Sequence, residues 1–70
     1  MLRKHSVTIN GHGTSYSIED EFHEELARLA SAQGKPLARM IAAIDAARQP
    51  GTNLSSAIRL HVLKALQSGK

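Results

Sequence analysis

The side chains with the most reactive chemistry in this chain are histidines, serines and a cluster of carboxylates. The histidines are His5, His12, His23 and His61. None of them are four residues apart on one helix and the chain has no cysteine, so no metal-ligand spacing is visible. Ser55-Ser56 lies at a helix start, outside any Gly-x-Ser-x-Gly turn. We therefore expect no enzyme activity, no metal and no cofactor, although a dimer could still bring histidines from two chains together.

Two further patterns have structural rather than catalytic interpretations. Every acidic residue except Asp45 lies between residues 19 and 25, where the positive end of a helix dipole favours carboxylates. Gly11-His12-Gly13 is too short for a phosphate-binding loop and precedes a strand instead of a helix. The first pattern indicates a helix start with a solvated face, and the second indicates a turn.

The hydrophobic period changes within the stretch 14–22. Tyr16 and Ile18 alternate with serines, which is the period of a strand. Phe22 and Leu26 then follow at helical spacing. The sequence therefore predicts a strand that runs almost directly into a helix.

A second strand should precede this one. Residues 3–9 are rich in alternating β-branched residues, and Asn10-Gly11 favours a tight hairpin turn. Ser17 is the expected N-cap of the first helix, Gly34 its end, and Asn53 or its neighbour Thr52 the N-cap of the last helix. The expected elements are strands at about 4–9 and 14–18 and helices at about 19–33, 36–48 and 54–67.

The length of the chain indicates self-association. A domain of 70 residues buries a small core and is marginally stable alone. Disulfides cannot compensate here, because there is no cysteine. The last helix also has an apolar band, widened by Leu60 and Leu63, that is broad for a single small domain. We expect one domain over residues 1–70 that forms a homodimer.

The charge suits a polyanionic partner. The net charge is +3, from 9 Lys and Arg against 6 Asp and Glu. No apolar run approaches the roughly 18–20 residues of a membrane span, and no apolar segment follows Arg3-Lys4 as in a signal peptide. We expect a cytoplasmic protein without membrane association.

The strand before the acidic helix could form half of a DNA-reading ribbon, because a β-ribbon fits the major groove. Two identical strands paired antiparallel across a two-fold axis would close each other's open edge. Tyr16 and Ile18 would then face the helices, and Ser15 and Ser17 the bases. Backbone amides near Lys35, at the start of the second helix, could hold a phosphate.

Several segments together resemble a known family. They are Ser6-Val7-Thr8-Ile9, Gly11-His12, Thr14-Ser15, Ile18-Glu19, Phe22, Leu26, Ala30, Ile41, Ile44-Asp45, Asn53-Leu54-Ser55-Ser56-Ala57, Arg59 and Val62-Leu63. Over about residues 5 to 66 the chain resembles the ribbon-helix-helix (Arc/MetJ-type) superfamily, and is most similar to short bacterial ribbon-helix-helix domain proteins of unassigned function. The resemblance implies a mainly α fold with an N-terminal β-hairpin or ribbon, an extra C-terminal helix, and an intertwined homodimer that binds DNA.

This reading assigns two sets of residues. Those expected to contact double-stranded DNA are Arg3, Lys4, Ser6, Thr8, Gly13, Ser15, Ser17 and Lys35. Those expected in the dimer core are Tyr16, Ile18, Phe22, Leu26, Ile41, Ile44, Ile58 and Val62. The outward positions of the second strand lack the cations that DNA-reading relatives often carry, and the added first strand either widens or blocks the DNA-facing surface. The alternative function is therefore a protein-interaction or dimerisation module, including an antitoxin-like role, that binds a second protein instead of reading a regulatory DNA site.

Overall fold

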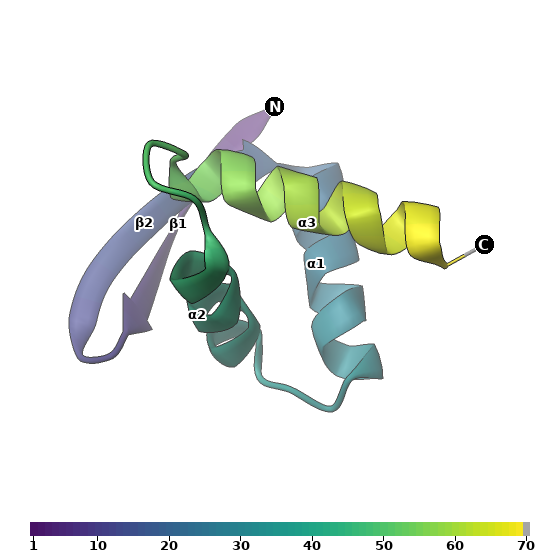
Figure 1. Ribbon diagram of the computed structural model, residues 1–70, viewed down its shortest axis with the longest axis horizontal. Helices are drawn as coiled ribbons and strands as arrows, with labels where there is room; N and C mark the ends of the chain where they lie inside the picture. Colours follow the sequence, from purple (N-terminus) through teal and green to yellow (C-terminus); the bar gives the residue numbers. More distant parts are fainter. Residues whose placement is uncertain (70) are drawn as a thin grey trace.

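The computed structural model describes residues 1–69, which form an antiparallel two-stranded ribbon followed by three helices (Figure 1). The elements are β1 (Leu2–Ile9), β2 (His12–Glu19), α1 (Asp20–Ala32), α2 (Leu37–Ala47) and α3 (Leu54–Ser68). The predicted mainly α fold with an N-terminal hairpin is confirmed, including a third helix beyond the minimal strand-helix-helix unit. Both strands are longer than the sequence indicated.

β1 and β2 are the two arms of one hairpin. Leu2 pairs with Glu19 at the open end, and Ile9 pairs with His12 at the turn. The turn residues Asn10 and Gly11 have φ angles of 51° and 82°. Positive φ at both positions matches the right-handed twist of the strands, which is why Asn-Gly favours this turn.

The helix ends are set by local backbone chemistry. Gly34 has a φ of 66° after α1, and the amide of Lys35 donates to the carbonyl of Ala30 over 2.9 Å, a glycine-based helix stop. Asn53 caps α3, because its side chain accepts a hydrogen bond from the Ser56 amide over 2.8 Å.

Ser17 does not cap α1, contrary to the sequence-based expectation. The N-cap position is Glu19, which makes no side-chain capping bond. The reason is that β2 stays paired with β1 as far as Glu19, so Ser17 remains inside the strand.

A single chain encloses the hydrophobic core. The core residues come from both strands and all three helices: Ile9, Tyr16, Ile18, Leu26, Ala30, Met40, Ile41, Ile44, Leu54, Ala57, Ile58 and Val62. All the residues expected in a dimer core are among them except Phe22, which is partly buried against the cluster. One chain thus already buries these side chains within its own core, and their expected role in a dimer core stays a prediction.

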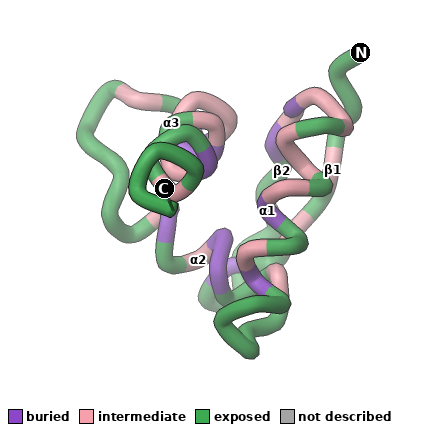
Figure 2. The backbone as a smooth tube through the Cα atoms, turned by 90° about the vertical axis from the view of Figure 1, so that its right-hand side faces the viewer, coloured by how far each residue is buried: buried purple, intermediate pink, exposed green. Residues whose placement is uncertain are grey.

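α3 packs across the rest of the molecule. It contacts α1, α2 and the β2 arm of the hairpin. Figure 2 looks along α3 and shows its buried residues on the side that faces α1 and the hairpin, with exposed residues on the other side. None of the helices within residues 1–69 is long and apolar enough to cross a membrane.

Candidate nucleic-acid interface

The solvent-facing side of the hairpin brings together most of the residues expected to read DNA. Side chains alternate along each strand, so Tyr16 and Ile18 enter the core while their neighbours face outward. In register, Thr8 is opposite Gly13, Ser6 opposite Ser15, and Lys4 opposite Ser17. A shallow groove on this face is lined by Lys4, Ser6, Val7, Thr8, Gly13, Thr14 and Ser15.

β1 therefore widens this face and does not cover it. It lies beside β2 in the same sheet, so its outward residues Lys4, Ser6 and Thr8 extend the polar surface of β2. Hydroxyl groups donate and accept hydrogen bonds, and the lysine supplies a positive charge. The face can thus make hydrogen bonds to base edges and one charge-assisted contact to a phosphate.

The second edge of β2 is closed at Ser17 by α3. The Ser17 amide donates to the Ser55 hydroxyl over 2.9 Å, and its carbonyl accepts from Arg59 Nη2 over 3.5 Å. In this chain β2 pairs with β1 on one edge and contacts α3 at Ser17 on the other, whereas the sequence-based expectation was that two β2 strands from different chains pair with each other. The strand contributed by the same chain needs only a two-residue loop, which carries a small entropic cost.

The two-stranded ribbon and the helices that follow it agree with the result of a family comparison. A family model described as "Ribbon-helix-helix domain" matches residues 2–66. The chain belongs to the ribbon-helix-helix domain family. Members are generally DNA-binding regulators or antitoxins. Comparison with curated proteins and with solved structures gave no match.

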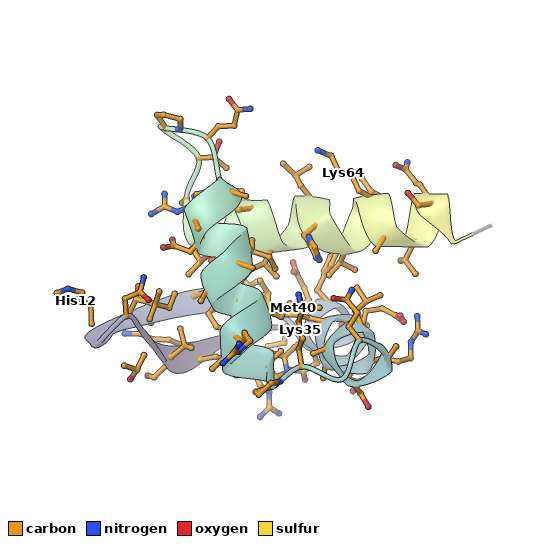
Figure 3. The ribbon with its side chains drawn as sticks, turned by 60° about the horizontal axis from the view of Figure 1, so that its bottom comes forward. His12, Lys35, Met40 and Lys64 are labelled. Carbon is orange, nitrogen blue, oxygen red and sulfur yellow. The ribbon has the colours of Figure 1, made fainter. Side chains whose placement is uncertain are left out.

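Two cations expected at the interface lie outside the groove of this ribbon-helix-helix domain. Arg3 is engaged with Asp20 of α1, with 3.1 Å between Arg3 Nε and Asp20 Oδ1. Lys35 lies in the connection between α1 and α2, whereas His12 marks the distant tip of the hairpin (Figure 3). The groove itself therefore has Lys4 as its cationic residue.

The charge distribution explains which cations remain available for an anion. Arg28, Arg48 and Arg59 form ion pairs with Glu25, Asp45 and Glu19. Within residues 1–69, the lysines and arginines outside such pairs are Lys4, Lys35, Arg39 and Lys64. Sequence reasoning did not select Arg39, which is exposed in the first turn of α2, shortly after Lys35 in the preceding connection.

Arg59 connects α3 to the junction between β2 and α1. Its Nε lies 3.0 Å from Glu19 Oε1, and its guanidinium carbon lies 6.0 Å from the centre of the Phe22 ring. The pKa of Glu19 is lowered by a hydrogen bond from its own backbone amide and by Arg59. This contact holds the end of the ribbon against α3.

A three-ring stack connects both strands of the ribbon to α1. The ring centres of His5 and His23 are 3.9 Å apart and nearly parallel, and Tyr16 stacks beside His5 at 5.3 Å. Burial, and then the nearby charge of His5, lower the pKa of His23. Among the residues that the structure describes, His5 Nε2 is buried without a hydrogen-bond partner. Residues 1–69 contain no group of three or more histidines, cysteines or acids close enough to hold a metal ion.

Proposed function

We propose that this protein is a homodimeric, cytoplasmic DNA-binding regulator that acts by binding rather than catalysis. In this proposal each chain places the outward face of its own hairpin in a major groove. The observation that carries the proposal is the groove in which Lys4, Ser6, Thr8, Gly13 and Ser15 meet on one exposed face. Membership of the ribbon-helix-helix family supports it.

The dimensions of the hairpin suit the major groove. Neighbouring strands lie about 4.8 Å apart, and the groove of B-DNA is about 12 Å wide and admits a two-stranded ribbon. β1 and β2 of one chain already provide both strands. A single chain can therefore present a complete ribbon, whereas a minimal strand-helix-helix unit presents one strand.

The side chains on this face divide into two roles. The hydroxyls of Ser6, Thr8 and Ser15 suit hydrogen bonds to base edges. Gly13 has no side chain, so the protein backbone there can approach the bases closely. Lys4 suits a phosphate oxygen. Lys35, in the connection before α2, and Arg39, in the first turn of α2, are two further cations that would contact the DNA backbone outside the groove.

Binding to duplex DNA over a range of salt concentrations tests the proposal. Neutralising phosphates releases counterions, so the logarithm of the affinity should fall linearly with the logarithm of the salt concentration. A chain with no affinity at low salt, or an affinity independent of salt, would contradict DNA binding. Competition between a selected and a scrambled duplex then separates sequence reading from charge attraction.

One observation favours a second candidate, a protein-interaction module that includes an antitoxin-like role. The outward positions of β2 carry no cation, since Gly13, Ser15 and Ser17 occupy them. A scaffold of this kind would keep the fold and bind another protein instead of DNA. Stoichiometric copurification of one protein, together with no salt-dependent DNA affinity, would support this candidate over the first.

A further inference from the structure

A hollow of about 210 Å³ lies at the corner where α2 and α3 pack against each other. The apolar part of its lining comes from both helices, with Ile44 and Ala47 on α2 and Ala57 and Leu60 on α3. Leu60 is 49% exposed, so its apolar surface is available to a ligand. We call this site the corner hollow. It shares no lining residue with the groove on the hairpin, so it is a separate candidate site.

The connection between α2 and α3 gives the corner hollow a wall that is bonded in place. Arg48 Nε donates to Asp45 Oδ1 over 2.7 Å, and Arg48 Nη1 donates to the Thr52 carbonyl over 2.7 Å. The Thr52 amide donates in turn to the Gln49 carbonyl over 3.1 Å. Arg48, Gln49 and Thr52 all line the hollow. A wall that is already ordered lowers the entropic cost of binding a ligand.

The polar part of the lining carries one uncompensated positive charge. Lys64 forms no ion pair within residues 1–69, whereas the charge of Arg48 is compensated by Asp45. His61 adds a ring nitrogen that can donate a hydrogen bond. Among the described residues that line the hollow, none is acidic. In Figure 3, Lys64 lies on the side of α3 on which the connection from α2 rises. The corner hollow therefore favours an anion with one negative charge over a more highly charged one.

The size of the hollow limits the apolar part of such a ligand. An apolar cavity of about 150 Å³ holds one benzene ring. The corner hollow, at about 210 Å³, has room for a ring of that size or a branched alkyl group, together with one small polar group. Pockets that enclose drug-sized ligands begin at about 300 Å³, so a nucleotide or a large cofactor is too big to be enclosed here.

We propose that the corner hollow binds a small monocarboxylic acid as a free molecule. Its ring or branched alkyl group lies against Ile44 and Leu60, and its carboxylate lies beside Lys64. This binding activity goes beyond the proposed function and does not depend on DNA binding, because the two sites share no lining residue.

Three probes test the site through the amide chemical shifts of the full chain: phenylacetate, its neutral amide phenylacetamide, and acetate. We expect phenylacetate to shift the amide resonances of residues that line the corner hollow, and the shifts to saturate. Acetate should bind at least about tenfold more weakly, because it lacks the apolar ring. Phenylacetamide should bind about threefold more weakly, because it keeps the ring but cannot pair with Lys64.

A change of charge at Lys64 tests the carboxylate contact. Lys64→Gln should weaken phenylacetate binding about threefold and leave phenylacetamide binding unchanged, because only the first probe carries a charge. Lys64→Arg should retain the wild-type affinity for phenylacetate. The matched control is Arg28→Gln, which removes a positive charge from α1, outside the hollow, and should affect neither probe.

A change at Leu60 tests the apolar contact. Leu60→Ala should weaken phenylacetate and phenylacetamide alike, at least about threefold. Its matched control is Leu63→Ala, because Leu63 is 48% exposed on the same helix but does not line the hollow. Circular dichroism should show all these variants folded, since the substituted side chains are exposed.

Four results would each overturn the proposal. Equal affinities for acetate and phenylacetate would indicate surface contact with an anion only. Equal affinities for phenylacetamide and phenylacetate would exclude a role for the charge of Lys64. Phenylacetate shifts that do not saturate, or that map to the groove on the hairpin, would show that the corner hollow is not the binding site. None of these results bears on DNA binding, which the salt-dependent titration with duplex DNA tests separately.

Discussion

The backbone amide of Ser17 donates a hydrogen bond to the hydroxyl of Ser55 over 2.9 Å, joining the outer edge of β2 to the first turn of α3. An open strand edge is a template for pairing with another chain. Here the edge is covered at the end of the ribbon that is next to the helices. The amides of Gly13 and Ser15 point towards the same edge nearer the turn, because outward amides alternate along an antiparallel strand.

We predict that Ser55→Ala destabilises the protein because the Ser17 amide loses its partner. Losing a hydrogen bond of this kind costs about 1 kcal/mol, and alanine in a helix returns up to about 0.5 kcal/mol. Urea unfolding should therefore show a small net loss of stability. Ser56→Ala is the matched control, because Ser56 lies in the same helical turn and its bond to Asn53 is made by the backbone amide, which alanine keeps. Equal stability of the two variants would show that the Ser17–Ser55 bond contributes nothing.

The sequence predicted the local features of the fold well. The Asn10-Gly11 turn, the alternation of Tyr16 and Ile18, and the Asn53 cap each depend on a few neighbouring residues. Such features follow from φ preferences, side-chain period and short-range hydrogen bonds, so they can be read without knowing the rest of the molecule.

The features that the sequence did not reveal are contacts between distant segments. Ser55 and Arg59 contact the edge of β2 at Ser17, although they lie 38 and 42 residues after Ser17 in the sequence. Arg3 was expected at DNA, but the hairpin places it beside Asp20. Charge and residue type indicate what a side chain can bind, while the packing of elements decides which partner is within reach.

We predict opposite outcomes for an aspartate on the two faces of β2. Ile18 is fully buried and Ser15 is exposed. A carboxylate at position 18 would have no compensating partner in the core, at a cost of several kcal/mol, which a chain of this size cannot offset. Ile18→Asp should therefore unfold, whereas Ser15→Asp should keep the wild-type circular dichroism spectrum and weaken DNA binding. A folded Ile18→Asp variant would contradict the core described here.

We predict that stability falls as the pH drops below neutrality, because of His23. Its pKa in the folded chain is lowered by burial and by His5, and Asp20 and Glu24 oppose the shift only in part. In the unfolded chain the pKa of a histidine is about 6.5, so the unfolded chain binds the proton more readily than the folded chain does. The free energy of unfolding should decrease as the pH falls through that value and level off below the folded-state pKa. Urea titrations between about pH 7.5 and pH 5 measure this, and His23→Gln should flatten the profile. His12→Gln at the turn should leave it unchanged.

The last prediction separates phosphate contact from base reading on the outward face of the hairpin. Lys4→Ala should weaken binding to every duplex alike and reduce the slope of affinity against salt by about one counterion. Ser15→Ala should leave that slope unchanged and reduce the preference for a selected duplex over a scrambled one, because a hydroxyl that contacts bases contributes to specificity and not to charge neutralisation. Arg28→Ala serves as a control for charge, since Arg28 is paired with Glu25 on α1, away from the groove. If Arg28→Ala changed the salt slope as much as Lys4→Ala does, the DNA would lie against the helices and the hairpin would not be the reading surface.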